Sequence, residues 1–316
     1  MIADDKAQAW PELTAARLWP TMETLQLWAQ IVGKTRLSQT PWLNHGWHVT
    51  LRVSARGLTT GLIPHGADGF SMEFDLIAEV LVIRVSDGGE RRIMLKSGTV
   101  AAFYAEVQEA LTALGVACRI DLTPDEMAEA TPFPLDERFR VYDPEVARDY
   151  WRALVQVDRV FNLSRTGFLG KSSPIQLFWG AFDLAVTRFS GRRAPLHPGG
   201  IPNLPDAVTR EAYSHEVSSV GFWPGDPGRE PGFYAYAYPA PAGFEAAAVS
   251  PTAAHWDAGL GEFILPYAAV RAEADPDAAL YAFLQSTYEA AADLAAWDRT
   301  ALDCPQGTPR RPRRVG

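Results

Sequence analysis

The residues best placed to do chemistry in this chain lie between positions 173 and 223. Asp183 stands in the apolar run Phe178-Trp-Gly-Ala-Phe-Asp-Leu-Ala-Val-Thr187, and Arg188 and Arg192 follow it. A charged group in apolar surroundings is costly unless a partner compensates it, so a ligand or a fold contact must organise these charges. Arg188 and Arg192 could form forked hydrogen bonds to a carboxylate or phosphate. An inter-sheet salt bridge beside a solvated loop is the structural alternative.

Two histidines follow closely on each other in Asn44-His-Gly-Trp-His48. On a regular strand, positions i and i+3 face opposite sides, so His45 and His48 could share a metal ion only if the chain bends between them. Structural histidines satisfied by the backbone are the plainer interpretation. His48 is the better acid/base candidate, because its face of the strand also carries Thr50 and Arg52.

A third histidine lies in Tyr213-Ser-His-Glu216. His215 and Glu216 are adjacent and would point to opposite faces of a strand, so a Ser-His-acid triad would need Asp183 from across the sheet. The alternative is a buried histidine bonded to a neighbouring strand. We take His48, His215, Glu216 and Asp183 as the catalytic candidates.

A fourth group of candidate site residues is aromatic. Phe233-Tyr-Ala-Tyr-Ala-Tyr238 places its tyrosines on one face of a strand. Such a stripe can stack on a sugar, a base or an acyl group, although tyrosines that cap a core sheet are common. Trp179, Trp223 and Tyr236, together with Arg188 and Arg192, are the candidate ligand contacts.

Composition excludes several classes of function. The 316 residues carry a formal net charge of −9, and −13 without the four arginines at positions 310–314, which argues against nucleic-acid binding. No G-x-G-x-x-G, Walker A or G-x-S-x-G motif is present, and Cys118 and Cys304 fit no metal or redox spacing. We therefore predict no cofactor and no metal. The absence of long apolar runs and of a leader-like start predicts a cytoplasmic protein with no membrane contact.

Periodicity predicts runs of strands between helices, which is typical of an α+β fold with mostly antiparallel sheets. The pattern predicts two similar α-β-β-β-β-α halves related by duplication, one at 1–122 and the other at 144–300. Residues 123–143 are expected to form a linker between them, and residues 301–316 a disordered basic tail. Helices are expected at 21–34, 98–114, 144–163 and 276–297. Strands are expected at 46–54, 70–76, 79–86, 90–96, 116–122, 177–188, 214–221, 232–238 and 261–267.

Several segments resemble a bacterial family of uncharacterised proteins, domain of unknown function 5996. They are Leu25-Gln-Leu-Trp-Ala-Gln-Ile-Val-Gly-Lys34, Arg56-Gly-Leu-Thr-Thr60, Phe178-Trp-Gly-Ala-Phe-Asp-Leu-Ala-Val-Thr-Arg-Phe-Ser-Gly-Arg192, Tyr213-Ser-His-Glu216 and Gly221-Phe-Trp-Pro-Gly225. The resemblance extends from about Trp10 to Trp297 and implies a single full-length module, but it implies no catalytic residues. Residues 196–206 lie outside it, and we give them no functional weight.

Three hypotheses for function follow. The first is an enzyme acting on a small anionic metabolite, with His215 or His48 as general acid/base and Arg188 and Arg192 holding the anion. The second is a non-catalytic module that binds a small ligand in an aromatic groove and has no strongly perturbed titratable group. The third is a scaffold without a small-molecule site. The first requires these side chains to converge in one cleft between the halves.

Overall fold

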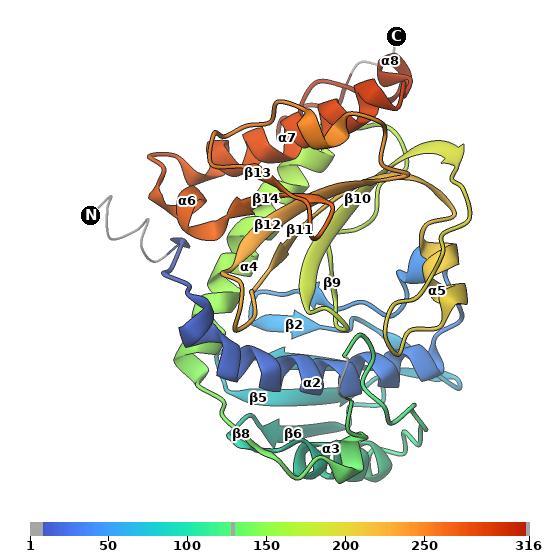
Figure 1. Ribbon diagram of the computed structural model, residues 1–316. Helices are drawn as coiled ribbons and strands as arrows, with labels where there is room; N and C mark the ends of the chain where they lie inside the picture. The colour runs from blue at the N-terminus through green and yellow to red at the C-terminus, as the bar shows by residue number, and fades with distance from the viewer. Residues whose placement is uncertain (1–8, 128–129, 314–316) are drawn as a thin grey trace.

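The computed structural model describes residues 9–127 and 130–313. Two six-stranded antiparallel sheets are flanked by helices, which confirms the α+β class (Figure 1). The helices are α2 (Ala15–Gln39), α3 (Val100–Ala113), α4 (Pro144–Arg165), α5 (Asp206–Ala212), α6 (Tyr267–Ala272), α7 (Pro276–Leu294) and α8 (Arg299–Leu302). In the described part of the chain, none of these helices combines the length and the apolar character needed to cross a membrane.

The first sheet has the order β1-β2-β4-β5-β6, with β3 paired to β4. Its strands are β1 (Arg52–Val53), β2 (Gly57–Thr59), β3 (Ile63–His65), β4 (Asp68–Asp75), β5 (Val80–Val85) and β6 (Glu90–Met94). Alternate residues of β4, namely Phe70, Met72 and Phe74, are fully buried. This face packs toward α2 and α3, where Trp28 stacks on Phe103 with ring centroids 4.6 Å apart.

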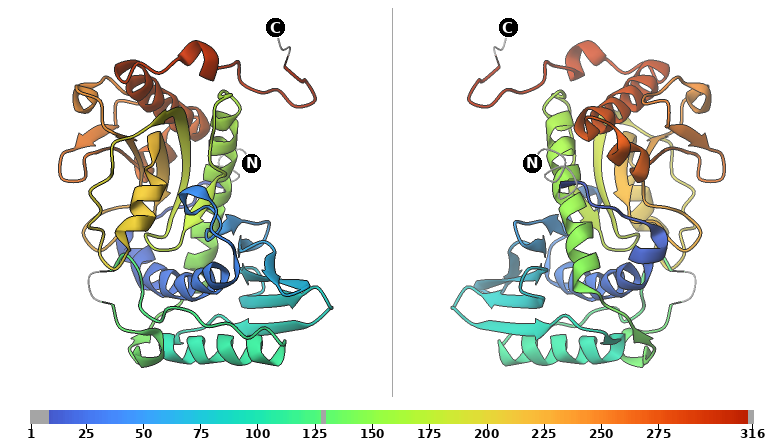
Figure 2. Two further views of the ribbon diagram at one scale, coloured as in Figure 1. Left: turned by 90° about the vertical axis from the view of Figure 1, so that its right-hand side faces the viewer. Right: turned by 90° about the vertical axis from the view of Figure 1, so that its left-hand side faces the viewer.

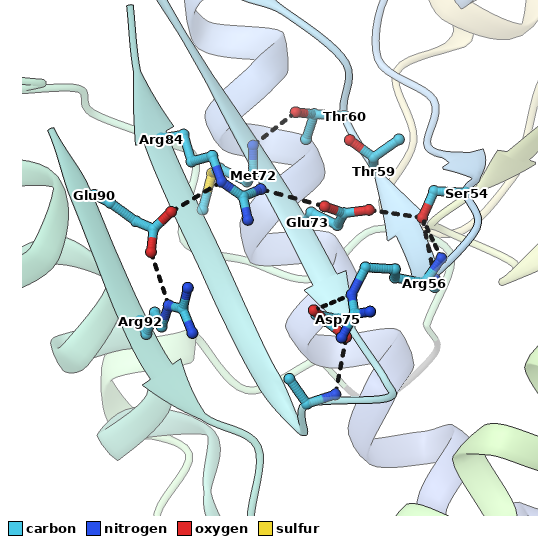
Figure 3. A network of polar contacts seen from close by, with 12 residues as sticks. Ser54, Arg56, Thr59, Thr60, Met72, Glu73, Asp75, Arg84, Glu90 and Arg92 are labelled. Carbon is cyan, nitrogen blue, oxygen red and sulfur yellow. Dashed lines mark hydrogen bonds and ion pairs between the residues drawn. The ribbon is translucent and has the colours of Figure 1, made fainter. Parts of the chain in front are cut away.

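The opposite face of the first sheet carries a charged network (Figure 3). The Arg84 guanidinium donates to Glu90 at 2.9 Å and to Glu73 at 3.3 Å, and Glu73 also accepts from the Ser54 hydroxyl at 2.7 Å. Ion pairs this exposed contribute little to stability. The network therefore marks a solvated surface.

The second sheet has the order β13-β14-β12-β11-β10-β9 and is antiparallel throughout. Its strands are β9 (Gln176–Phe178), β10 (Asp183–Arg193), β11 (His215–Trp223), β12 (Gly232–Tyr238), β13 (His255–Asp257) and β14 (Glu262–Pro266). The buried side chains of Leu184, Phe222 and Phe233 belong to the main core, on the side where α4 and α7 pack. The other face of the second sheet is not the one on which α4 and α7 pack, and it can line a site.

The two sheets join at their edges. Leu51 and Leu177 exchange backbone hydrogen bonds of 3.0 and 2.9 Å. Helix α4 runs beside both sheets, from α7 to the first sheet (Figure 2), and one hydrophobic core connects the two parts of the chain. The internal duplication is not confirmed and stays a prediction.

Some expected elements were wrong. The strand expected at 46–54 is limited to β1 (Arg52–Val53). It is preceded by a 3-10 turn, η1 (Asn44–Gly46), because His45 and Gly46 both have positive φ. Residues 177–188 form a hairpin rather than one strand: the Phe182 N–H donates to the Phe178 carbonyl at 2.8 Å and closes the turn. Residues 116–122 pair with no strand.

The segments predicted to be a linker and a tail make specific contacts. Residues 123–143 contain η2 (Phe133–Leu135) and β8 (Phe139–Arg140), which pairs with β7 (Gly98–Thr99). Near the C-terminus, the Gly307 N–H donates to the Thr166 hydroxyl at 2.9 Å. Arg314 and residues 1–8, on which part of the localisation prediction rests, lie outside the described residues.

Candidate active site

A cavity of about 1200 Å³ lies against the free face of the second sheet. Its other walls come from α2, the η1 turn, the segment 121–126 and the stretch 201–213 that contains α5. Small-molecule sites typically occupy about 300–1000 Å³, so this cavity has room for a whole metabolite.

Strand register explains which side chains reach the cavity. Ala185 of β10 pairs with Gly221 of β11, which pairs with Tyr234 of β12. Because residues two apart on a strand share a face, every second residue of these strands points into the cavity. The residues presented in this way include Asp183, Ala185, Thr187, Ser219, Gly221, Trp223, Tyr234, Tyr236, Glu262 and Ile264.

Asp183 is the most deeply placed acid of this wall. Its side chain accepts a hydrogen bond from the Tyr234 hydroxyl, and the residue is 8% exposed. Burial raises the pKa of Asp183 to about 6, although the Tyr234 hydrogen bond opposes that rise. Gly221 makes the pairing possible, because a Cβ at that position would lie 2.2 Å from the Tyr234 ring.

Two further acids approach from other elements. Glu262 comes from β14, and Glu126 comes from the segment that precedes the loop to η2. Glu262 is half-buried, whereas Glu126 is exposed as a residue and only its carboxyl lies against the protein. Limited solvation of the carboxyl, followed by the nearby Asp183 charge, raises the pKa of each to about 7. Gly180 lies directly against Glu126: a Cβ there would come within 2.0 Å of its carboxylate oxygen.

The buried cation of the cavity is already paired. Lys34 Nζ lies 2.8 Å from Asp125 and 3.4 Å from Asp121, and 5.8 Å from the centroid of the Trp179 ring. Gln30 holds this segment to α2, because its amide exchanges hydrogen bonds of 3.0 and 2.7 Å with the Asp125 backbone. Lys34 therefore already has its charge partners within the protein.

Four of the catalytic and ligand-contact candidates named from the sequence line the cavity: Asp183, Trp179, Trp223 and Tyr236. The Trp179 indole donates to the Val49 carbonyl at 2.9 Å. The Tyr236 hydroxyl lies 2.9 Å from the Tyr213 hydroxyl. These contacts fix the orientation of the aromatic wall.

The catalytic candidates other than Asp183 lie outside the cavity. His48 is buried, its Nδ1 accepts from the Leu43 N–H at 3.2 Å, and burial lowers its pKa. His215 contacts the hydroxyl of its neighbour Ser214 at 3.1 Å. Glu216 forms an ion pair of 2.7 Å with Arg192. The expected convergence of these groups with Arg188 does not occur.

The two arginines expected to hold an anion are bound to the protein. Arg188 donates to the Ser164 carbonyl at 2.7 Å and to its hydroxyl at 2.8 Å, and its guanidinium lies 4.2 Å from the Tyr288 ring centroid. Arg192 donates to the carbonyls of Ala295 and Ala296. Their positions follow from the strand alternation: Arg188 shares a face with the buried Leu184 and Val186, not with Asp183.

Arg188→Met is therefore expected to change ligand binding and turnover by less than about twofold, because a methionine can replace the buried stem without entering the cavity. Arg188→Ala should instead cost about 2–4 kcal/mol of unfolding free energy through the space it leaves. Urea unfolding and binding measurements on both variants check this. A loss of binding in a stable Arg188→Met protein would contradict it.

Histidine does enter the cavity wall, but through His45. Its Nε2 lies 2.6 Å from Lys171 Nζ, and its Nδ1 lies 3.0 Å from the Ala212 carbonyl. Burial, followed by the Lys171 charge, lowers the pKa of His45. Within residues 9–127 and 130–313, no three His, Cys, Asp or Glu side chains come close enough together to hold a metal ion.

Sequence reasoning missed several cavity residues. Glu126 stood in an acid-rich stretch taken as a linker, and Glu262 began an ordinary strand. The loop from Ile201 to Pro205, to which no functional weight was given, also lines the cavity, and its Pro202 carbonyl accepts from the Glu126 N–H at 3.0 Å. The sequence offered one signal for this part of the cavity: Lys34 is a charged residue within the apolar pattern of a helix.

Comparison with known proteins identifies a family, but no activity is known for that family. No curated protein and no solved structure matches the chain. A family model matches residues 10–304, which is most of the chain and includes every cavity element described above. The chain therefore belongs to the family of unknown function DUF5996.

Proposed function

We propose that this protein is an enzyme that acts on a small molecule in the cavity, with Asp183 as its general acid/base. The observation that carries the proposal is a carboxyl 8% exposed whose side-chain partner is a neutral phenol, Tyr234. A purely structural acid at such a depth is normally paired with a cation. Asp183 instead faces open space of molecular size.

The environment of Asp183 suits proton transfer. A general acid or base works best when its pKa lies near the operating pH, and the pKa of Asp183 is raised to about 6. Perturbed acids gathered in one cavity are typical of catalytic sites. Tyr234 would orient the carboxyl and stabilise its ionised form through the hydrogen bond.

This proposal replaces the histidine and arginine roles of the anion hypothesis, since those side chains lie elsewhere. The second candidate, a non-catalytic binding module, is favoured by the aromatic wall of Trp179, Trp223 and Tyr236. That hypothesis required a groove without perturbed titratable groups, and the carboxyls of Asp183, Glu126 and Glu262 do not meet the requirement.

The test is conversion of metabolites in a mixture. Purified protein is incubated with a defined set of small metabolites, and mass spectrometry follows which compounds disappear and which form. We expect Asp183→Asn to slow the conversion by at least about 100-fold, the usual scale for losing a general acid/base. The matched control is Glu109→Gln, an exposed carboxyl on α3, which should convert at the wild-type rate. Wild-type conversion by Asp183→Asn would rule the proposal out.

A further inference from the structure

The cavity wall is strongly acidic. In the part of the chain that the structure describes, seven carboxyl side chains line it, against two fixed cations, Lys34 and Arg229. The carboxyls are those of Asp121, Asp125, Glu126, Asp183, Glu230, Asp257 and Glu262. The arginines nearest in sequence to Asp183 point away from the cavity, as shown above. The fixed cations of the wall therefore do not balance its carboxyl groups.

Some of these acids are compensated by the protein. Asp121 and Asp125 share Lys34. Glu230 accepts the Ala15 N–H at 2.8 Å at the start of α2, and Asp257 accepts the N–H groups of the turn that follows it.

Three acids form no ion pair with a cation among the described residues: Asp183, Glu126 and Glu262. Of these, only Glu262 is influenced by a cavity cation, because the charge of Arg229 acts against the rise of its pKa. Asp183 and Glu262 belong to the sheet wall, through β10 and β14, and Glu126 comes from the separate 121–126 segment. Asp183 is more than nine-tenths buried, and Tyr234, its side-chain partner, supplies no charge.

Aromatic rings complete the surroundings. Tyr234 and Tyr236 stack with centroids 6.0 Å apart, and Trp223 lines the same wall. Lys34 lies over Trp179, and Lys171 lies over Trp47 and Phe189, so three rings of the cavity already contact a cation. Among the described residues, no cation lies over Tyr234, Tyr236 or Trp223. Aromatic faces attract organic cations, most strongly where water is excluded.

We infer that the ligand of this cavity is an organic cation, an amine or quaternary ammonium compound with an apolar body, whose charge is held by Asp183, Glu126 and Glu262. The inference rests on the proposed site but not on its catalytic role. The cavity volume and its largely apolar lining fit a ligand larger than a simple ammonium ion.

Binding should depend on pH. The pKa values of Asp183, Glu126 and Glu262 are raised to about 6, 7 and 7, so their carboxyls take up protons as the pH falls through this range. Cation binding is then strongest above this range and is lost below it. The other titratable and charged groups that line the cavity are Lys34, His45, Asp121, Asp125, Tyr213, Arg229, Glu230, Tyr236, His255 and Asp257, with Tyr234 on Asp183.

The test compares choline with its uncharged isostere 3,3-dimethylbutan-1-ol on the full chain, followed by NMR titration. At about pH 8, we expect choline to bind at least about tenfold more tightly than the alcohol, and at about pH 5 the preference should disappear. A variant combining Asp183→Asn, Glu126→Gln and Glu262→Gln should lose the preference but keep the alcohol affinity. Asp183→Asn alone should reduce it, and Glu109→Gln should not.

Two outcomes overturn the inference: equal binding of the two probes, or no binding of choline at about pH 8. If the probes bind equally while Asp183→Asn still abolishes metabolite conversion, the charge assignment fails and the proposed enzyme stands. If choline is preferred and Asp183→Asn converts metabolites normally, the enzyme proposal fails and the cation site stands.

Discussion

Asp183→Asn is expected to stabilise the protein at neutral pH by about 3 kcal/mol, although it removes the proposed catalytic group. Asp183 is buried, and its pKa is raised to about 6, compared with about 3.9 in an unfolded chain. Each pKa unit corresponds to about 1.4 kcal/mol, so ionising the folded protein at this site costs about 3 kcal/mol. An amide of the same shape can still accept the Tyr234 hydrogen bond without a charge.

The pH dependence has a definite sign. Between about pH 4 and pH 6, the folded protein holds a proton on Asp183 that the unfolded chain has lost, so the contribution of this residue to stability decreases as the pH rises. The loss is complete above the folded pKa of about 6. The advantage of Asp183→Asn should therefore be near zero at about pH 4 and full at about pH 7.5.

Urea unfolding of the two proteins across this range measures the difference. Glu109→Gln, with its carboxyl exposed on α3, should show no such pH-dependent gain. A constant difference between wild type and Asp183→Asn at every pH would contradict the assignment of the titrating group. Such a gain in stability on loss of function is typical of active-site residues.

Gly33→Ala is expected to destabilise the protein by about 2 kcal/mol, although helix propensity predicts the opposite. Replacing a mid-helix glycine by alanine usually gains about 1 kcal/mol. A Cβ at Gly33 of α2, however, would lie 2.2 Å from the Trp179 indole, which is 6% exposed. Overpacking costs about 1–3 kcal/mol, and displacing the indole also breaks its 2.9 Å hydrogen bond to Val49, worth about 1 kcal/mol.

A double-mutant cycle isolates the cause. In a Trp179→Ala background the steric conflict is gone, so Gly33→Ala should become stabilising by about 1 kcal/mol. Gly98→Ala, on the short strand β7, is the control for adding a Cβ without a clash, because this Cβ would meet only the Lys96 carbonyl oxygen at 3.9 Å. If Gly33→Ala has the same effect with and without Trp179, the close contact is not the reason for the glycine.

Long periodic elements could be predicted from sequence. The helices expected at 98–114 and 144–163 occur at Val100–Ala113 and Pro144–Arg165, and the strand expected at 232–238 is β12. In these segments most residues of one face are buried, so the hydrophobic pattern can be recognised within the segment itself. Other expectations failed, and the clearest case is the hairpin within 177–188. Its turn has a positive φ at Phe182, a residue type that rarely adopts it, and Gly180 was the only turn-forming residue type within that turn.

The candidate site was only partly predictable. The alternation of β10 placed Asp183 and Arg188 on opposite faces, and this already separated the acid from the proposed anion holder. It did not show which of the two faces is open. That depends on where α4 and α7 pack, and on the 201–213 stretch closing the other side.

The amino-acid sequence by itself determined the α+β class, the long helices and the faces of the strands, because these follow from periods of 2 and 3.6 residues within one segment. Only the tertiary structure decided that Lys34, Glu126, Asp183 and Glu262 share one cavity. They are separated by tens of residues, and their meeting depends on the packing of sheets and loops against one another. No local pattern records that packing, because each of these residues is ordinary within its own segment.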